Sequence, residues 1–429
     1  MSYRILMLAH GHPRYSQGGG EVASYRLCQE YRRQGHRVFF LARGEHPVRT
    51  GDKLINATDT PDDFLINTSI GDWFTVSCAE SGRMAQEVTD LVQYLRPDVV
   101  HFHHYMHLGL EMLSVVRRAC PNSIILLTLH EFMGICLQNG QMYTTQDKLC
   151  TSSDYVACAK CFPERSPSDF FLRKQYFLHH FLLMDGFIAP SKFLRSRYVA
   201  WGLPEEHFEV IENGMIPLAR APLEPGDPLH VAFFGQITPY KGVDVLLEAC
   251  AMLTKQETKR LKISLYGGNL QWHPQEFQDK IHRLLKEAPD CVTWHGPYKP
   301  TEAERLYADV DAVIVPSIWW ENSPLVIQEA FAMGRPVLCS NIGGMAEKVR
   351  DGIDGLHFEP GSPKAIVAVL RRLLTNHKLL PQLAQGIKPP FSVSRCAEAH
   401  LAFIGRLVCG KQTVGRTTPQ ETALPCENI

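Results

Sequence analysis

Two glutamates, Glu321 and Glu329, stand eight positions apart in the otherwise mostly apolar stretch WWENSPLVIQEAFAMG. A carboxylate rarely enters apolar surroundings without a partner, so both are candidates for chemistry. One interpretation places them around a bound diphosphate, with one carboxylate beyond the phosphates and the other facing a neighbouring ribose. The alternative is structural: Glu321 is then a solvated loop residue, and Glu329 pairs with a nearby cation.

The residues between the glutamates predict the start of a helix. Serine at the N-cap and proline at the first helical position favour a helix that begins at Ser323 and Pro324. Gly334 would end it. The free N–H groups of Leu325 and Val326 would then point out of the positive end of the helix dipole, which is an arrangement that binds phosphate.

Two further segments carry residues that suit a phosphorylated ligand. In SQGGGEVAS, Gly18, Gly19 and Gly20 would let backbone amides approach a substrate closely, although a plain tight turn explains the same residues. In FFGQITPYKGVD, Lys241 supplies a point positive charge for a diphosphate leaving group. Without a bound metal, some such group must offset the charge that builds on a departing phosphate.

Histidines gather at the ends of two predicted strands. His130 closes the apolar run of residues 124–129, at the sheet edge where a substrate would lie, but a structural histidine fits there too. Its neighbour Glu131 either orients an acceptor or is merely exposed. The run HFHHYMH has no carboxylate or cysteine close by in sequence, so we favour cleft lining or burial over a metal site. Its histidines are His101, His103, His104 and His107.

Four cysteines form a separate cluster. Cys136, Cys150, Cys158 and Cys161 fall in an insertion at about residues 134–165, and the last two form a Cys-Ala-Lys-Cys motif. Four thiolates in a short loop with little core suit a tetrahedral structural zinc ion. Disulfides and free thiols are the alternatives. Four protein ligands would leave zinc no open position for catalysis, so its role would be structural.

The elements that must position these residues alternate along the chain. Short apolar runs are separated by longer amphipathic segments, which predicts parallel, doubly wound α/β sheets. The strand candidates are residues 4–9, 37–42, 98–103, 124–129, 186–191, 230–235, 262–267, 291–296, 311–317 and 335–340. The order of strand, glycine-containing loop and helix occurs near both residue 4 and residue 230, so we expect two Rossmann-like domains facing across a central cleft.

Composition suggests where the domains begin and end. Residues 1–215 would form the N-terminal domain, the proline-rich residues 216–229 a linker, and residues 230–390 the C-terminal domain. Residues 391–410 would form a helix that packs back on the N-terminal domain, and the polar residues 411–429 a flexible tail.

Composition also excludes some classes of function. Lys plus Arg (44) nearly equals Asp plus Glu (45), so there is no electrostatic case for a nucleic-acid partner. No window approaches ~18 consecutive apolar residues, so no membrane span is expected. Thirteen cysteines, an odd count, and an N-terminus unlike a signal peptide favour a reducing cytoplasm. Residues 168–187 mix aromatic with basic side chains. They predict either a surface that binds at a membrane interface or an amphipathic helix packed on its own domain, and we favour the helix.

Taken together, these motifs resemble those of the family 4 retaining glycosyltransferases, which have the GT-B fold. The family pattern of Glu, seven residues and Glu matches Glu321 and Glu329, and its Gly-Gly-x-x-Glu turn matches GGMAE, which ends at Glu347. The SQGGGEVAS loop, the TLHEF segment with His130 and the FFGQITPYKGVD loop with Lys241 resemble further family motifs in the right order. The resemblance covers most of the chain.

The resemblance implies an enzyme that transfers a sugar from a UDP- or GDP-linked donor to a carbohydrate or lipid-linked hydroxyl acceptor, with retention and without a catalytic metal. Such an enzyme would act in polysaccharide or glycoconjugate biosynthesis, at the cytoplasmic face of a membrane or free of it. The N-terminal domain would hold the acceptor. A sugar-nucleotide epimerase, a phosphorylase and a non-catalytic nucleotide-sugar-binding protein are the alternatives.

The resemblance also assigns roles to single residues. His130, Glu321 and Lys241 would be catalytic, with Glu321 on donor sugar hydroxyls. Gln236 stands where the family usually has an arginine, so it brings no charge to the phosphates. The donor-binding residues, with Glu329 on the ribose, would be Gly19, Gly20, Gln236, Lys241, Ser323, Pro324, Leu325, Val326 and Glu329.

Overall fold

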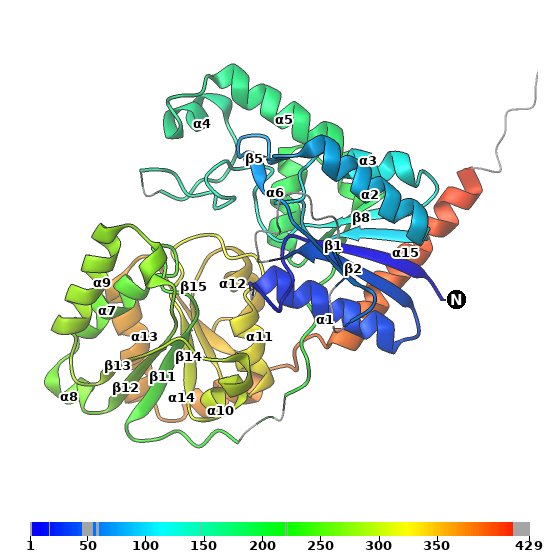
Figure 1. The fold of residues 1–429 in the computed structure, drawn as a ribbon. Helices are drawn as coiled ribbons and strands as arrows, with labels where there is room; N and C mark the ends of the chain where they lie inside the picture. Colours follow the sequence, from blue (N-terminus) through cyan, green and yellow to red (C-terminus); the bar gives the residue numbers. More distant parts are fainter. Residues whose placement is uncertain are drawn as a thin grey trace, which may run out of the picture.

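The computed structural model of the chain describes residues 2–16, 18–44, 55–56, 60–146, 148–218, 220 and 222–414. Over these ranges the chain forms two α/β units, each built around one mainly parallel sheet (Figure 1). The predicted pair of Rossmann-like units is therefore confirmed.

The N-terminal sheet has the strand order β10-β9-β8-β7-β1-β2-β4-β3, and its pairs are parallel except for β3 with β4. Its strands are β1 (Arg4–Ala9), β2 (Arg37–Arg43), β3 (Ile55–Asn56), β4 (Asp63–Ile66), β7 (Val99–Phe102), β8 (Ile124–Thr128), β9 (Gly186–Ala189) and β10 (Phe208–Val210). A short antiparallel pair, β5 (Ile70–Asp72) and β6 (Ser77–Cys78), lies outside this sheet.

The C-terminal sheet is parallel throughout, with the strand order β13-β12-β11-β14-β15-β16. Its strands are β11 (Leu229–Phe234), β12 (Leu261–Tyr266), β13 (Val292–Gly296), β14 (Ala312–Val315), β15 (Val337–Ser340) and β16 (Gly355–Phe358).

Helices connect most strands. Those of the N-terminal unit are α1 (Gly19–Arg33), α2 (Ser81–Leu95), α3 (Met112–Ala119), α4 (Tyr155–Cys161), α5 (Pro167–Phe181), α6 (Lys192–Trp201) and the 3-10 turn η1 (Glu205–His207). Those of the C-terminal unit are α7 (Val243–Ala251), α8 (Lys255–Thr258), η2 (Leu270–Trp272), α9 (Gln275–Glu287), η3 (Pro300–Glu302), α10 (Ala303–Ala308), α11 (Leu325–Ala332), α12 (Gly343–Lys348), α13 (Pro363–Thr375) and α14 (Leu379–Gly386). The last helix is α15 (Val393–Val414).

Both faces of the N-terminal sheet are buried, as the continuous apolar runs of its strands require. Successive side chains of a strand point to opposite faces. In β1, Leu6 and Leu8 therefore join the core under α2, α3 and α5, whereas Ile5 and Met7 join the core under α1 and α15.

In each sheet the first strand lies in the middle, because β1 is flanked by β7 and β2, and β11 by β12 and β14. Ligands of doubly wound sheets bind at such switch points, beyond the C-terminal strand ends. The glycine loop follows β1, and the loop with Lys241 follows β11. The fold thus places both loops where a ligand is expected.

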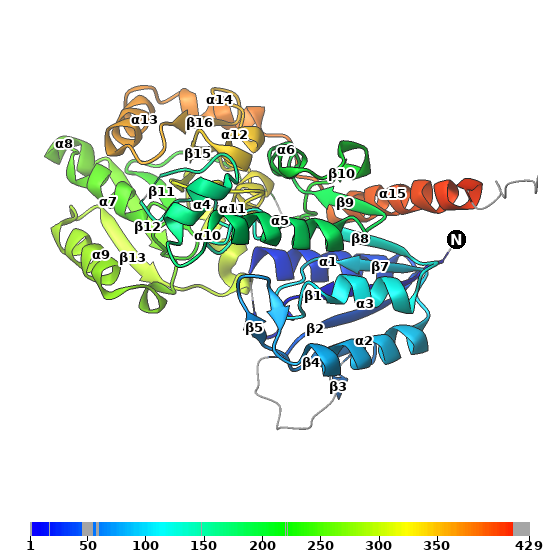
Figure 2. The same cartoon turned by 90° about the horizontal axis from the view of Figure 1, so that it is seen from above.

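The chain crosses between the units twice, and the two crossings lie side by side. The N–H of Met215 donates to the carbonyl of Phe391 at 2.8 Å, and the N–H of Val393 donates to that of Met215 at 3.0 Å. After the second crossing α15 packs against α1, although it follows the C-terminal unit in sequence (Figure 2). Within the described ranges no helix has the length and apolarity needed to cross a bilayer.

Candidate functional site

Glu321 and Lys241 form an ion pair at the C-terminal edge of the second sheet. Lys241 Nζ donates to Glu321 Oε1 at 2.5 Å, and the same oxygen accepts from Ser317 Oγ at 2.8 Å and from Trp319 Nε1 at 3.2 Å. The Glu321 side chain is buried, whereas that of Lys241 is 28% exposed. The sequence assigned these two residues separate contacts, and the structure brings them together.

A tight turn holds Lys241 in place. Gly242 has a φ of +68°, and a Cβ at this position would lie 2.0 Å from the carbonyl oxygen of Pro316, so only glycine fits. On the other side of Lys241, the carbonyl of Tyr240 accepts a hydrogen bond from the N–H of Ile318 at 2.9 Å. The loop after β11 is thereby fastened to the loop after β14.

Helix α11, for which the sequence predicts phosphate binding, begins one residue later than predicted. Pro324 is the N-cap, with an extended ψ of 119° and no side-chain capping bond, so the predicted cap by Ser323 is wrong. Ser323 Oγ instead accepts a bond from Asn213 Nδ2 at 3.5 Å. The N–H groups of Leu325 and Val326 lie in the first turn of α11, where no intrahelical acceptor is available to them.

Glu329 lies in α11 and is fixed by a residue that the sequence did not single out. Tyr307 of α10 donates its hydroxyl proton to Glu329 Oε2 at 3.0 Å. Burial raises the pKa of Glu329, against the opposing effects of the Tyr307 bond and the charge of Arg26. Tyr307 is itself buried and stacks on Phe234, with ring centroids 4.1 Å apart. No sequence motif marks Tyr307, because its role arises from the packing of α10 beside α11.

The glycine loop of the first unit reaches both His130 and α11. A Cβ on Gly20 would lie 3.6 Å from His130 Cγ, and one on Gly19 would lie 3.8 Å from Leu325 Cδ1. Asn322, beside Glu321, donates from Nδ2 to the carbonyl of His130 at 3.1 Å. The residues predicted from four separate motifs therefore surround one stretch of the second unit.

Glu21 holds the glycine loop to the end of β1. Its Oε1 lies 3.0 Å from His10 Nε2 and accepts from Ser16 Oγ at 2.5 Å. Burial acts to raise the pKa of Glu21, but the bonds from His10 and Ser16 outweigh it and lower the pKa to about 2. Glu21 is therefore a charged residue that shapes the loop.

Three of the four histidines of the run at the end of β7 are buried. His101, His103 and His104 are at most 5% exposed, and burial lowers the pKa of each well below its ordinary value. His103 Nδ1 lies 3.2 Å from His130 Nε2. Burial also lowers the pKa of His130 to about 4, so the His130 ring is neutral near pH 7. Next to it, Glu131 lies 3.5 Å from His104 Nε2, and burial raises its pKa to about 8.

The Gly-Gly-x-x-Glu turn joins the two units. A Cβ on Gly344 would lie 1.7 Å from the carbonyl oxygen of Asn322, so this turn wraps closely around the segment that carries Glu321. The Glu347 carboxylate accepts the N–H groups of Lys192 and Phe193, at 2.9 Å each, at the start of α6 in the first unit. The glutamate of this motif thus acts here as a helix cap.

The cysteine insertion contacts the second unit but is not arranged as a metal site. Trp320 Nε1 donates to the carbonyl of Cys150 at 2.8 Å, and the rings of Tyr143 and Tyr240 lie 5.5 Å apart. Within the described ranges, no group of three or more His, Cys, Asp or Glu side chains is placed to hold a metal ion. As they lie, the thiols of Cys136, Cys150, Cys158 and Cys161 therefore do not fit zinc. The structural zinc stays a prediction, which metal analysis of the purified protein tests.

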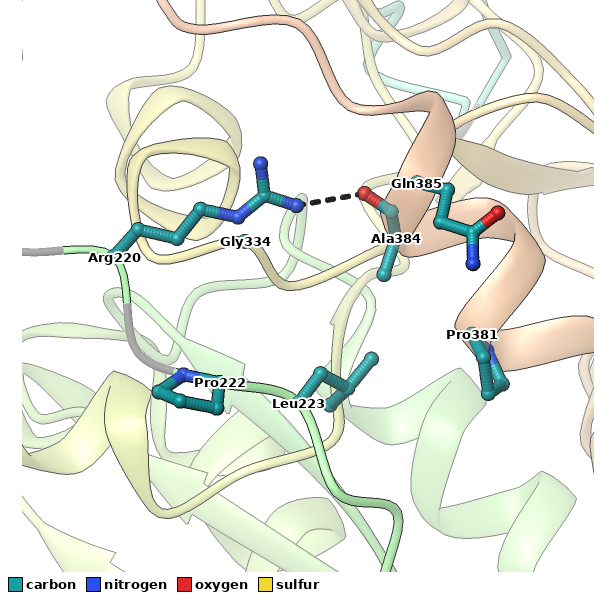
Figure 3. A pocket seen from close by; sticks show the side chains of 7 residues that line it. All are labelled: Arg220, Pro222, Leu223, Gly334, Pro381, Ala384 and Gln385. Atoms are coloured by element: carbon teal, nitrogen blue, oxygen red, sulfur yellow. Dashed lines mark hydrogen bonds between the residues drawn. The ribbon is translucent and has the colours of Figure 1, made fainter.

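A cavity of about 400 Å³ lies apart from these residues, between the linker and α14 (Figure 3). Arg220 Nη2 donates across it to the carbonyl of Ala384 at 2.8 Å. Its lining residues are Arg220, Pro222, Leu223, Gly334, Pro381, Ala384 and Gln385. None of the predicted catalytic or donor-binding residues is among them, so the cavity is separate from the candidate site.

Two family models match the chain, one in each half. The model described as Glycosyltransferase Family 4 matches residues 17–217, and that described as Glycosyl transferases group 1 matches residues 217–388. Two solved structures align with nearly the whole chain: Anabaena HepE with UDP and glucose (TM-score 0.61, 18% identity, 97% of this chain and 100% of that one) and a glycosyltransferase of Rickettsia africae (TM-score 0.68, 18% identity, 95% and 99%). At these identities the likeness shows the fold.

Curated relatives are similar over part of their length. A lipopolysaccharide 1,2-N-acetylglucosaminetransferase of Salmonella typhimurium is 32% identical over 216 residues, which are 47% of this chain and 56% of that protein. A D-inositol 3-phosphate glycosyltransferase of Nocardia farcinica is 38% identical over 141 residues, which are 32% and 31% of the two chains. The chain thus spans about half of the first relative and about a third of the second.

Proposed function

Because this chain belongs to the family 4 glycosyltransferases, we propose that it transfers a sugar from a nucleoside diphosphate to a hydroxyl acceptor, with retention of the anomeric configuration. One observation carries the proposal. The Lys241–Glu321 ion pair, the N-terminus of α11 and His130, whose carbonyl accepts a hydrogen bond from Asn322, all adjoin residues 319–325. Those groups are the ones that a diphosphate and its sugar require.

The second unit holds the donor in this proposal. The N–H groups of Leu325 and Val326 bind the phosphates, and Glu329, held by Tyr307, binds the ribose hydroxyls. Lys241 turns from Glu321 toward the diphosphate as negative charge develops on it. The donor is a UDP- or GDP-linked sugar, and the complexes of Anabaena HepE with UDP-glucose and with UDP support the first of these.

The transfer follows a front-face displacement in this proposal. The bond between the anomeric carbon and the diphosphate breaks, the acceptor oxygen bonds to the same face, and an oxygen of the leaving phosphate takes the acceptor proton. Glu321 and His130 hold hydroxyls of the reacting sugar. Contact between the two units would exclude water, which would otherwise hydrolyse the donor.

Calorimetric titration with UDP, GDP and ADP tests the donor site. We expect one of them to bind, and Glu329→Ala to weaken that binding by about tenfold or more, since a hydrogen bond to a charged group contributes ~1.5–3 kcal/mol. Glu276→Ala is the matched control, because Glu276 is an exposed glutamate of α9 in the same unit. If none of the three nucleotides binds, the assignment of the donor site fails.

A non-catalytic nucleotide-sugar-binding protein is the second candidate, and Gln236 favours it. Gln236 is exposed in the same loop after β11 as Lys241, and it brings no charge to the leaving group. Incubation of the protein and its donor with a panel of acceptors separates the two candidates. Transfer supports the enzyme, whereas binding without turnover supports the second candidate. An isomerised sugar nucleotide in the absence of acceptor would instead indicate an epimerase.

The first unit holds the carbohydrate or lipid-linked acceptor in this proposal, at the cytoplasmic face of a membrane. Helix α5 buries Phe177 and Phe181 in its own unit, yet Phe171 and Leu172 are 46% and 61% exposed, and Val156 of the adjoining α4 is 56% exposed. These three apolar side chains support a peripheral contact with lipid.

A further inference from the structure

A row of polar side chains lies behind His130 on one face of the first sheet. Alternate residues of a strand share a face, so His101 and His103 point the same way from β7, as do Thr128 and His130 at the end of β8. This is the face that α1 and α15 cover with apolar side chains. Burying four polar groups in such a layer costs desolvation free energy, so we expect them to have a function.

The row is continuous in space. His103 Nδ1 lies 3.2 Å from His130 Nε2, and the two rings stack with centroids 5.5 Å apart. The His101 ring lies 4.1 Å from that of His103, and its Nε2 lies 2.7 Å from Thr128 Oγ1. Contact with the His103 ring and the Thr128 bond fix His101, and His101 in turn limits the movement of His103.

The hydrogen bond between the two imidazoles has two forms. Both rings are neutral near pH 7, so one nitrogen donates its proton and the other accepts it. If His103 Nδ1 donates, the other nitrogen of His103, Nε2, carries a lone pair. If His130 Nε2 donates, His103 Nε2 must carry a proton. His103 Nε2 is buried, and no described residue bonds to it. An unpaired N–H is a rarer buried group than an unpaired acceptor, which favours donation by His103 Nδ1.

We propose that His103 is a positioning residue that fixes the tautomer of His130, so that His130 presents an Nδ1–H donor to the reacting sugar. His103 donates to Nε2 of His130, so the single proton of the neutral His130 ring sits on Nδ1. His130 then acts as a hydrogen-bond donor to a sugar oxygen rather than as a base. The contact with sugar rests on the proposed function, whereas the tautomer does not.

Nitrogen NMR of protein labelled with ¹⁵N-histidine tests the tautomer directly. The His130 signals are assigned by their loss in His130→Gln. We expect His130 in the natural chain at pH 7 to carry its proton on Nδ1, and His103→Phe to convert it to a mixture of both tautomers. A proton on Nε2 in the natural chain would overturn the proposal, as would an unchanged tautomer in folded His103→Phe. This measurement decides the matter whether or not transfer activity is found.

Kinetics test the consequence. We expect His103→Phe to lower kcat about tenfold with a donor KM changed by less than about threefold, as the loss of one oriented hydrogen bond predicts. His103→Asn, whose amide offers a donor near the position of Nδ1, should restore most of kcat. If His103→Phe does not fold, the kcat of His103→Asn and the nitrogen NMR spectrum of the natural chain still test the proposal.

His180→Phe is the matched control. His180 is also a buried imidazole of the first unit, and it bonds to Ser114 Oγ at 2.6 Å on α3 without contacting His130. This variant should lower the midpoint of thermal unfolding and leave kcat and the His130 tautomer unchanged. An equal loss of kcat in His180→Phe and His103→Phe would contradict the proposal, because a general loss of stability would then explain both.

Discussion

At the residue scale, the Glu321 carboxylate is oriented by one partner far along the chain and two nearby. Its Oε1 accepts from Lys241, which lies 80 positions earlier, as well as from Ser317 and Trp319 nearby. Ser317 and Trp319 still orient the carboxylate when Lys241 turns toward the diphosphate, and a group oriented in advance stabilises a transition state with little reorganisation.

We expect Glu321→Gln to lower turnover by about a hundredfold, the order found when one preorganised polar group is lost. The substitution keeps the shape of the side chain but removes the charge that pairs with Lys241. Nucleotide affinity should change by less than about threefold, because no nucleotide group is assigned to Glu321. Transfer rates and calorimetry on the same preparation measure both effects, and turnover equal to that of the natural chain would remove Glu321 from the mechanism.

Residue types and motifs alone identified the polar groups with an intrinsic chemistry: His130, Lys241, Glu321 and Glu329. They could not identify Tyr307 or Asn322, because an ordinary tyrosine in an amphipathic segment becomes a partner of Glu329 only after α10 packs beside α11. The sequence predicted that His101 and His103 share one face of a strand. Their bonds to Thr128 and His130, however, depend on the register of β7 with β8.

At the element scale, the turn at Gly242 joins two strand ends into one site. A side chain there would meet both a left-handed φ and the carbonyl of Pro316 at 2.0 Å, whereas Gly296 has a φ of +79° with nothing within 4 Å. A substitution at Gly296 therefore tests backbone strain alone, whereas one at Gly242 tests backbone strain and close approach together.

We expect Gly296→Ala to lower the free energy of unfolding by about 1 kcal/mol, the usual effect of a left-handed alanine. Gly242→Ala should lower it by at least about 2 kcal/mol more, because the turn must move away from Pro316. Denaturant titration measures both, and nucleotide affinity should fall only in Gly242→Ala. Equal losses of stability in the two variants would show that the turn adapts to the extra carbon.

The start of α11 shows why helix boundaries are harder to predict than helices. Serine followed by proline is a strong start signal, yet Pro324 keeps an extended ψ, and the helix begins after it at Leu325. Ser323 is drawn instead toward Asn213 of the crossing segment, a tertiary contact that no local pattern contains. The end of the helix at Gly334, which depends on a local left-handed φ of +74°, was predictable.

At the scale of the whole molecule, seven buried or partly buried histidines predict that stability depends on pH. Burial lowers the pKa to about 4 in four of them and well below the ordinary value in three more. They are His107, His130, His180 and His400, and His101, His103 and His104. Below about pH 6.5 the unfolded chain therefore binds more protons than the folded one. Glu111, Glu131 and Glu329, whose pKa values are raised, act in the opposite direction.

Because the histidines outnumber these carboxyls, we expect the free energy of unfolding to fall by at least about 2 kcal/mol between pH 6.5 and pH 5. Urea titrations at several pH values measure the slope. His400→Phe, which removes one such group from α15, should flatten the slope in this window. A protein that is as stable at pH 5 as at pH 6.5 would contradict the expected neutrality of these rings.

The repeated order of strand, loop and helix predicted two units, because each repeat is a local pattern. It did not predict that the cysteine insertion of the first unit contacts the second through Trp320 and Tyr240. Such contacts join surfaces of separate units, and no periodicity in the chain describes how two surfaces meet.

The cap that Glu347 places on α6 has a consequence for any attempt to produce the two halves as separate polypeptides. Of the first three N–H groups of α6, Ser191 accepts one, from Leu194, and Glu347 accepts the other two. An isolated first half would start this helix with two unmatched amides, and an isolated second half would lose the partner of its carboxylate. Each fragment would therefore lack one side of this contact. A chimaera of halves from different relatives would have to take Glu347 and the start of α6 from the same relative.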